Sequence, residues 1–240
     1  QKQTIVTFTG ITLSEVGYFS AVAGSGQVTL YWENPSQYFT EALLIRRAGS
    51  APAAGPTDGT SYAVGGTLAD GSEVIYRGAA ETAAQAGLTN GTKYYYKAYT
   101  AYSSSSLYSA GTVLDVTPSA GGVGQPTWEY ALQGGNFLSG VALDVNGALF
   151  LSGEGSRAIA LQGSDGSHVW SPVRAQGDLV SGVNWIPLSG TGLSTAYVVG
   201  GDATGRAYAV NQATGSVVWQ VSLTGAERVE HLIALRELQD

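Results

Sequence analysis

The sequence predicts an all-β protein with two domains, a β-sandwich followed by a partial repeat domain. Between Gly17 and Pro118, short runs of alternating apolar and polar residues are separated by turn residues, without helical periodicity. This pattern is typical of antiparallel sandwiches. Further along, Arg157–Trp170 (RAIALQGSDGSHVW) and Arg206–Trp219 (RAYAVNQATGSVVW) are identical at seven of fourteen positions. The second part of the chain therefore contains an internal repeat.

These patterns divide the chain into four segments. A β-prone N-terminal arm spans residues 1–16 and the sandwich spans 17–118. Residues 119–126 are rich in glycine and end on proline, which is typical of a linker. Residues 127–240 hold two repeats with partial flanking strands.

Alternating residues mark the strands of the sandwich. In Gly26–Pro35, Val28, Leu30 and Trp32 fall on one face, and the polar or half-polar residues between them fall on the other. Further strands are expected within residues 42–47, 73–78, 87–102 and 107–118. In the third of these, Tyr94, Tyr96 and Ala98 share a face.

Spaced residues in this segment resemble a fibronectin type III domain over about a hundred residues. They are Trp32, Leu88, the turn Asn90-Gly91-Thr92 (also a glycosylation sequon), Tyr94 and Thr117-Pro118. The resemblance implies that Tyr94 is a tyrosine-corner residue, whose hydroxyl bonds back to the turn just before it. It also implies a spacer or adhesive module without catalysis.

Each repeat reads as four short strands, which is the content of one propeller blade. The final hairpin, with its glycine turn and closing tryptophan, resembles the quinoprotein-like (PQQ-type) β-propeller repeat. That resemblance implies that Trp128, Trp170 and Trp219 pack between neighbouring blades. Gly166 and Gly215 stand at the turn between the last two strands, where a side chain would be strained.

About two blades do not close a ring, which takes at least four. Three explanations fit: the chain is a piece of a longer one, neighbouring subunits supply the missing blades, or the two units pack as a small sandwich. The tail at residues 226–240 fits either a strand or a helical stripe.

The N-terminal arm is strongly β-prone because Ile5, Val6, Phe8 and Ile11 are interleaved with threonines. Two interpretations fit this stretch. It extends the first strand of the sandwich, or it adds to the open sheet edge of another subunit by β-augmentation. In the second case these four residues carry the assembly contacts.

Composition excludes several classes of function. The formal net charge is −7, and only 12% of residues are charged. With no basic patch, nucleic-acid binding is not expected. No apolar run approaches the length of a membrane span, and there is no cysteine. Because the chain opens on Gln1 without methionine or a signal-like segment, we expect mature, exported bacterial material at the cell surface or outside the cell.

The sequence contains no constellation of catalytic residues. The only histidines are His168 and His231, and neither lies near a nucleophile motif. Residues 144–147 and 200–205 resemble calcium loops but lack the closing glutamate. Quinone-dependent enzymes of the propeller type need a closed ring and a set of cofactor ligands that this chain does not supply. We therefore predict no enzyme activity, catalytic residue, cofactor or metal.

The predicted function is that of a non-enzymatic extracellular structural or adhesive protein, a self-assembling subunit of a bacterial cell-surface filament or pilus-like appendage. Its expected partners are copies of itself or other surface proteins. The first domain is rich in tyrosine, and exposed tyrosines also stack on sugars. The alternative is therefore a ligand- or carbohydrate-binding fragment of a larger exported β-propeller protein.

Overall fold

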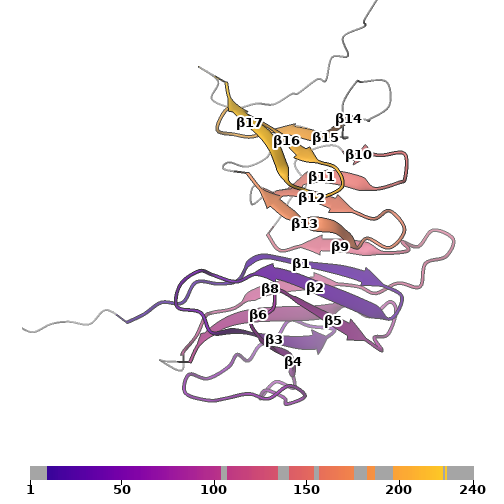
Figure 1. Cartoon of the computed structure of the whole chain (residues 1–240). Coiled ribbons are helices and arrows are strands. Elements are labelled where there is room, and N and C mark those ends of the chain that lie inside the picture. The colour runs from indigo at the N-terminus through magenta and orange to yellow at the C-terminus, as the bar shows by residue number, and fades with distance from the viewer. Residues whose placement is uncertain are drawn as a thin grey trace, which may run out of the picture. The chain divides into compact units, whose positions relative to one another are not determined.

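The computed structural model describes residues 10–103, 107–134, 141–153, 157–175, 183–186, 197–223 and 225. Every regular element in these ranges is a β-strand (Figure 1), so the all-β class is confirmed. None of the described segments forms a helix long and apolar enough to cross a membrane. The chain divides into two compact units, Gln1–Gln133 (unit 1) and Gly134–Asp240 (unit 2).

Unit 1 contains two antiparallel sheets. The first has the order β5-β2-β1-β9, and the second has the order β4-β3-β6-β7 with β8 also paired to β6. The strands of the first sheet are β1 (Gly17–Gly24), β2 (Gln27–Glu33), β5 (Thr82–Ala86) and β9 (Glu129–Leu132). Those of the second are β3 (Glu41–Ala48), β4 (Glu73–Gly78), β6 (Tyr94–Tyr102), β7 (Leu107–Tyr108) and β8 (Thr112–Val116).

The main core of unit 1 lies between these sheets. Val28, Leu30 and Trp32 of β2 are buried there, as their alternation in the sequence predicts. Tyr96 and Ala98 face the same core from β6. Burial of these alternating side chains is what fixes the register of each strand, because a slip by one residue would expose them.

Strand β3 is buried on both faces. Leu44 faces the main core, while Leu43 and Ile45 belong to a second cluster with Leu68 and Tyr99. The long connection from β3 to β4 covers this second face and contributes Leu68. This explains why β3 reads as a nearly continuous apolar run instead of an alternating one.

Strand β9 differs from the sequence-based assignment, which placed Trp128 and the following residues with the repeats. In the structure β9 pairs with β1, with Ala23 opposite Glu129 and Ser20 opposite Leu132. The division between the units therefore falls after Gln133 and not near residue 126. The physical reason is that β1 would otherwise expose a row of unpaired backbone groups at its edge.

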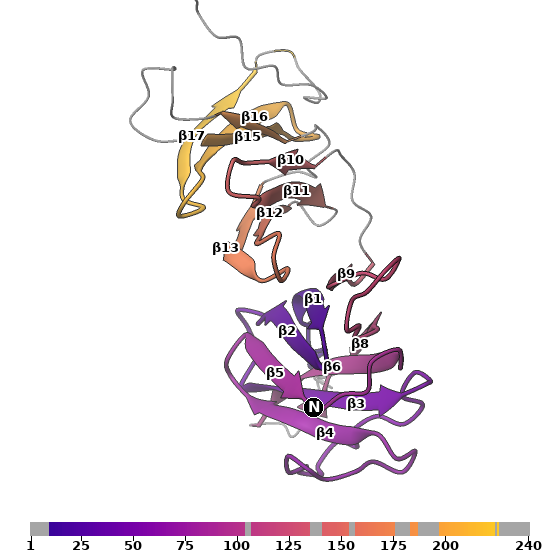
Figure 2. The same cartoon turned by 90° about the vertical axis from the view of Figure 1, so that its right-hand side faces the viewer.

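Unit 2 contains two four-stranded antiparallel sheets in simple sequential order, each a propeller-like blade (Figure 2). The first is built of β10 (Ala142–Leu143), β11 (Leu149–Gly153), β12 (Arg157–Leu161) and β13 (His168–Arg174). The second is built of β14 (Asn184–Ile186), β15 (Tyr197–Gly201), β16 (Arg206–Asn211) and β17 (Val217–Ser222). The two repeated sequences form the hairpins β12–β13 and β16–β17, so they occupy equivalent positions in the two blades.

The two blades share one core. Phe150, Ala160 and Trp170 of the first blade pack with Val198 and Val210 of the second. Neither blade could bury these side chains alone, which is the physical reason for repetition in such folds.

Several sequence-based expectations fall outside the described residues. These are the arm residues Ile5, Val6 and Phe8, His231 and the tail at 226–240. Ile11 is described; it is exposed and lies before β1 in a segment without strand structure. Leu13 and Val16, in contrast, are buried and fix the chain just ahead of β1.

Candidate functional site

The contact between the two blades of unit 2 is centred on Trp170. Its indole Nε1 donates a hydrogen bond of 2.9 Å to the carbonyl oxygen of Gln212. Its ring lies against Gly215, where an added Cβ would be 2.7 Å from the ring. Gly215 also has a φ of +70°, which side chains rarely adopt. Trp170 therefore packs between neighbouring blades, and glycine is required opposite it.

The side chain of Gln212 strengthens the same contact. Trp185 of β14 donates its indole N–H to Gln212 Oε1 over 2.8 Å, and Gln212 Nε2 donates to a carboxylate oxygen of Asp144 in the first blade. The other oxygen of Asp144 accepts the backbone N–H groups of Asn146 and Ala148, both at 2.8 Å. Asp144 thus stabilises a turn of the first blade and also binds the side chain of Gln212 from the second blade. Sequence reasoning missed Gln212, because the first repeat has Gly163 at that position.

Trp219 occupies the position of Trp170 in the second blade. Trp170 pairs with Ala160 on β12, and Trp219 pairs with Ala209 on β16. Trp170 is only 8% exposed, whereas Trp219 is 42% exposed. The exposed apolar residues of this strand and its end, here called the β17 face, are Val217, Val218, Trp219, Val221 and Leu223.

The other residues singled out from the sequence have structural surroundings. Trp32 and Leu88 are buried in the main core of unit 1, and Gly166 is a buried turn residue with a φ of +73°. Trp128 is half-buried and precedes β9 in unit 1, so it does not belong to unit 2 with the other two repeat tryptophans.

Tyr94 makes the contact that defines a tyrosine corner. Its hydroxyl accepts a hydrogen bond of 3.0 Å from the backbone N–H of Thr89, in the turn just before β6. Within the same turn, Asn90 Oδ1 accepts the N–H of Gly26 over 2.8 Å. The Asn-Gly dipeptide thus serves as a turn that ties the loop before β6 to the β1–β2 hairpin.

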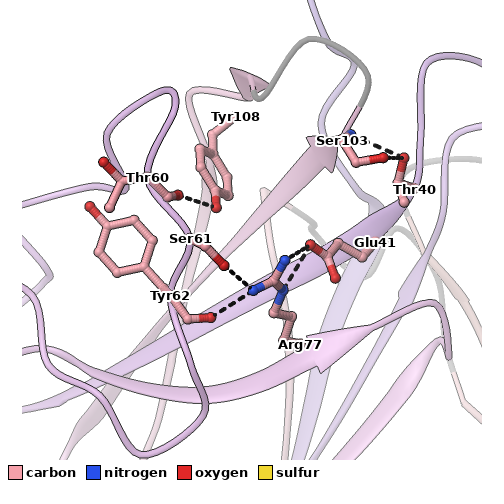
Figure 3. Close-up of polar contacts among 8 residues, drawn as sticks. All are labelled: Thr40, Glu41, Thr60, Ser61, Tyr62, Arg77, Ser103 and Tyr108. Carbon is pink, nitrogen blue, oxygen red and sulfur yellow. Dashed lines mark hydrogen bonds and ion pairs between the residues drawn. The ribbon is translucent and has the colours of Figure 1, made fainter.

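Unit 1 also has a polar cleft of about 120 Å³. Figure 3 shows Arg77 at its base, reaching Glu41 on one side and a loop on the other. Arg77 Nε and Nη2 lie 2.8 and 2.6 Å from Glu41 Oε1. Arg77 Nη1 donates to Ser61 Oγ over 2.6 Å and to the carbonyl oxygen of Tyr62 over 3.1 Å. The guanidinium is therefore held rigidly in one plane.

Neighbouring contacts fix the remaining wall of this cleft. The Tyr108 hydroxyl donates to the carbonyl oxygen of Thr60 over 2.8 Å, and Asp58 accepts the N–H of Tyr108 over 2.9 Å. The hydrogen bond that Arg77 donates to Glu41 raises the pKa of Arg77, and burial raises the pKa of Tyr108. Near neutral pH the cleft thus holds a charged guanidinium and a neutral phenol.

One further tyrosine lines the cleft, and a second packs against that tyrosine. Tyr102 lines the cleft, and the ring of Tyr38 packs edge-on against Tyr102 with a centroid separation of 5.8 Å. Tyr38 is 51% exposed and has a φ of +50°, in the left-handed region. Such backbone strain in a residue other than glycine persists only where surrounding structure holds it, and it is concentrated at functional sites.

The abundance of tyrosine in unit 1 is visible in the sequence, but nothing in the sequence singles out Arg77, Glu41 or Tyr38. The only signal is that basic residues are rare: arginine and lysine together number 11 in the chain. Among the described residues, no group of three or more histidine, aspartate or glutamate side chains is placed to hold a metal ion.

Comparison with known families matches residues 64–239 to the family described as outer membrane protein assembly factor BamB. The chain belongs to this family. The BamB family match covers unit 2 and begins within unit 1, ahead of β4. No curated protein matched the chain.

Among solved structures, the crystal structure of BamB from Moraxella catarrhalis is 18% identical, with a TM-score of 0.34. That match covers 48% of this chain and 33% of the Moraxella chain. The match thus spans about a third of the length of that BamB.

Proposed function

We propose that this chain is a non-enzymatic structural protein of the cell surface that assembles with copies of itself through the β17 face. The observation that carries the proposal is the pair Trp170 and Trp219. The first is covered by the turn of the next blade, and the second has the same place in its blade but is exposed. An apolar face of this kind marks a site of protein contact.

The occupant we propose is the N-terminal arm of a second copy. Within the described part of the chain, β17 pairs only with β16, so its outer edge is available for another strand. Residues 3–13 are β-prone and contain no charged side chain, so pairing there buries no charge. An arm of one copy on the edge of the next is a head-to-tail contact, which propagates into filaments when it does not close.

For unit 1, we propose a fibronectin type III domain that serves as the spacer between such contacts. The order β5-β2-β1 in one sheet and β4-β3-β6-β8 in the other supports this assignment, as does the hydrogen bond from Thr89 to Tyr94. The β9 strand is then an addition to the edge of the first sheet.

A second candidate function is ligand or carbohydrate binding by a fragment of a larger exported propeller protein. The specific observation in its favour is the polar cleft at Arg77.

The test uses three variants of the full chain, examined by light scattering and negative-stain electron microscopy. Deletion of residues 1–9 removes most of the arm but spares the buried Leu13, and Trp219→Ser alters the β17 face. Val123→Ser is the matched control, because Val123 is fully exposed in unit 1. We expect regular assemblies of the unaltered chain and of V123S, and monomers of the other two with unchanged circular dichroism. A monomeric unaltered chain, or assembly without the arm, would overturn the proposal.

A further inference from the structure

We propose that the polar cleft of unit 1 binds carbohydrate, with one sugar residue of a glycan seated between Arg77, Glu41 and Tyr102. The site lies in unit 1 and the β17 face belongs to unit 2. The proposal deepens the second candidate function above and does not depend on the assembly proposal. Three properties of the cleft carry the inference: its pattern of donors and acceptors, its charge balance and its aromatic wall.

The base of the cleft offers donors and acceptors side by side. Both contacts from Arg77 to Glu41 go to Oε1, as Figure 3 shows. This ion pair therefore does not use Oε2, which can accept a hydrogen bond from a ligand. Arg77 Nη2 lies beside it, and a guanidinium nitrogen of this kind carries two N–H donors. Adjacent sugar hydroxyls each donate and accept, so a fixed donor next to a fixed acceptor matches two of them together. Bonds to charged partners are also stronger than bonds between neutral groups.

The charge balance of the cleft favours a neutral ligand. The guanidinium of Arg77 is matched by the Glu41 carboxylate at 2.6 Å, so the pair presents no net charge. The chain as a whole has a formal charge of −7, which disfavours approach of phosphate or carboxylate ligands. A hydroxyl-rich neutral molecule satisfies the polar groups without adding a charge that must be compensated.

The aromatic wall supplies the remaining part of a sugar site. Tyr102 is one of the residues that line the cleft, and Tyr38, which does not line it, packs edge-on against the ring of Tyr102. Tyrosine offers a rigid apolar face with a polar end at small entropy cost, and the C–H face of a sugar ring packs on such a surface. The left-handed backbone of Tyr38 holds an exposed ring at this position despite its strain. No packing requirement of the core explains that strain, because Tyr38 belongs to neither core cluster of unit 1.

The size of the cleft favours a single sugar ring, and not a protein surface, as its ligand. Its volume of about 120 Å³ far exceeds the roughly 10–15 Å³ needed for one water. A stable protein contact instead buries about 800 Å² per partner, whereas small ligands bind in concave sites. The cleft is therefore suited to a small polar ring.

The test is saturation-transfer NMR on the full chain with the methyl glycosides of glucose, galactose, mannose and N-acetylglucosamine as probes. We expect at least one glycoside to bind in the millimolar range. Tyr102→Ala and Arg77→Lys should each weaken it at least fivefold, since lysine cannot reproduce the planar contacts. Lys93→Gln, which breaks the exposed ion pair to Asp115 in the same unit, is the control and should bind as the unaltered chain does.

Tyr38→Ser is added because this variant is expected to keep the fold, since Tyr38 is half exposed and lies outside the core clusters. It should weaken the glycoside at least threefold while the thermal unfolding midpoint stays within a few degrees of that of the unaltered chain. Absence of saturation transfer to every glycoside would overturn the proposal. So would binding that persists in both Y102A and R77K. Assembly should be unchanged in all four variants, which separates this test from that of the β17 face.

Discussion

Trp170 packs on Gly215, so that the closing tryptophan of one blade lies on the turn glycine of the next. Within each repeat the glycine and the tryptophan are four residues apart, as in Gly166–Trp170 and Gly215–Trp219. In the observed contact the first repeat supplies the tryptophan and the second repeat supplies the glycine, and Gly166 and Trp219 hold the equivalent positions in the two repeats. The glycine and the tryptophan recur in both repeats, whereas residues 162–165 and 211–214, just before the glycine, differ at every position.

The Trp170–Gly215 contact predicts a large effect for Gly215→Ala. Alanine there meets both the left-handed backbone, about 1–2 kcal/mol, and the tryptophan ring, about 1–3 kcal/mol. The matched control is Gly147→Ala, because Gly147 has a φ of +84° but open space around it. We expect G215A to lower the free energy of unfolding of unit 2 by at least about 2 kcal/mol more than G147A. Urea unfolding followed by tryptophan fluorescence measures this, and equal losses would contradict the contact.

The pH dependence of unit 2 should reflect His168. Burial lowers the pKa of this imidazole from its ordinary value of 6.5 to about 4. The unfolded chain therefore binds a proton more readily than the folded one. Stability from this group is complete above about pH 6.5 and is lost as pH falls toward 4, on the order of 3 kcal/mol in all.

The control for this dependence is His168→Val, which installs the residue found at the equivalent position 217. Unfolding free energies measured from pH 7.5 to 4 should fall less steeply for H168V than for the unaltered chain. Identical slopes would show that His168 does not cause the dependence.

Part of this structure was predictable because local patterns determine it. The faces of β2 and β6 follow from alternation, and the paired β12–β13 and β16–β17 hairpins follow from the repeated sequence. Strand β5 was not singled out, since its sequence TAAQA has weak β-propensity; it forms because β2 offers an edge, with Ala83 opposite Leu30. Strand β9 pairs with β1 across more than a hundred residues, a choice that no local pattern encodes.

The cleft could not be predicted from the sequence, for a related reason. Glu41, Ser61, Arg77 and Tyr102 come from separate strands and loops with no fixed spacing. Only the pairing of β3 with both β4 and β6 brings them to one place. Sites made by side chains that meet across a sheet leave no motif in the chain, in contrast to the glycine and tryptophan of the repeat.

Acid should also weaken unit 1, through Asp70. Burial raises the pKa of this carboxyl, but the backbone N–H groups of Ala54, Ser72 and Ala53 bond to it and together hold its pKa well below the ordinary range. Stability from Asp70 is present above its unfolded pKa of roughly 3.9 and is lost as pH falls below that value.

Asp70→Asn imitates the protonated carboxyl and should lower the unfolding free energy of unit 1 at pH 7 by about 1–3 kcal/mol. The difference from the unaltered chain should shrink between pH 4 and 2. Asp115→Asn is the control, because Asp115 makes an exposed ion pair with Lys93, and exposed pairs contribute little to stability. Guanidinium unfolding at several pH values measures both variants, and a D70N deficit that is constant with pH would contradict this account.

Strain and ring contact at Tyr38 are separated by comparing Tyr38→Gly with Tyr38→Ala. Both variants lose the contact with Tyr102 and should bind the glycoside equally weakly. Alanine keeps the strain of a φ near +50°, whereas glycine adopts that conformation readily. Y38G should therefore be more stable than Y38A by about 1 kcal/mol, although Gly→Ala changes elsewhere usually stabilise. Thermal unfolding measures the difference. If Y38A were the more stable, the backbone at residue 38 would have relaxed in the variant, and strain would not be what holds the ring against Tyr102.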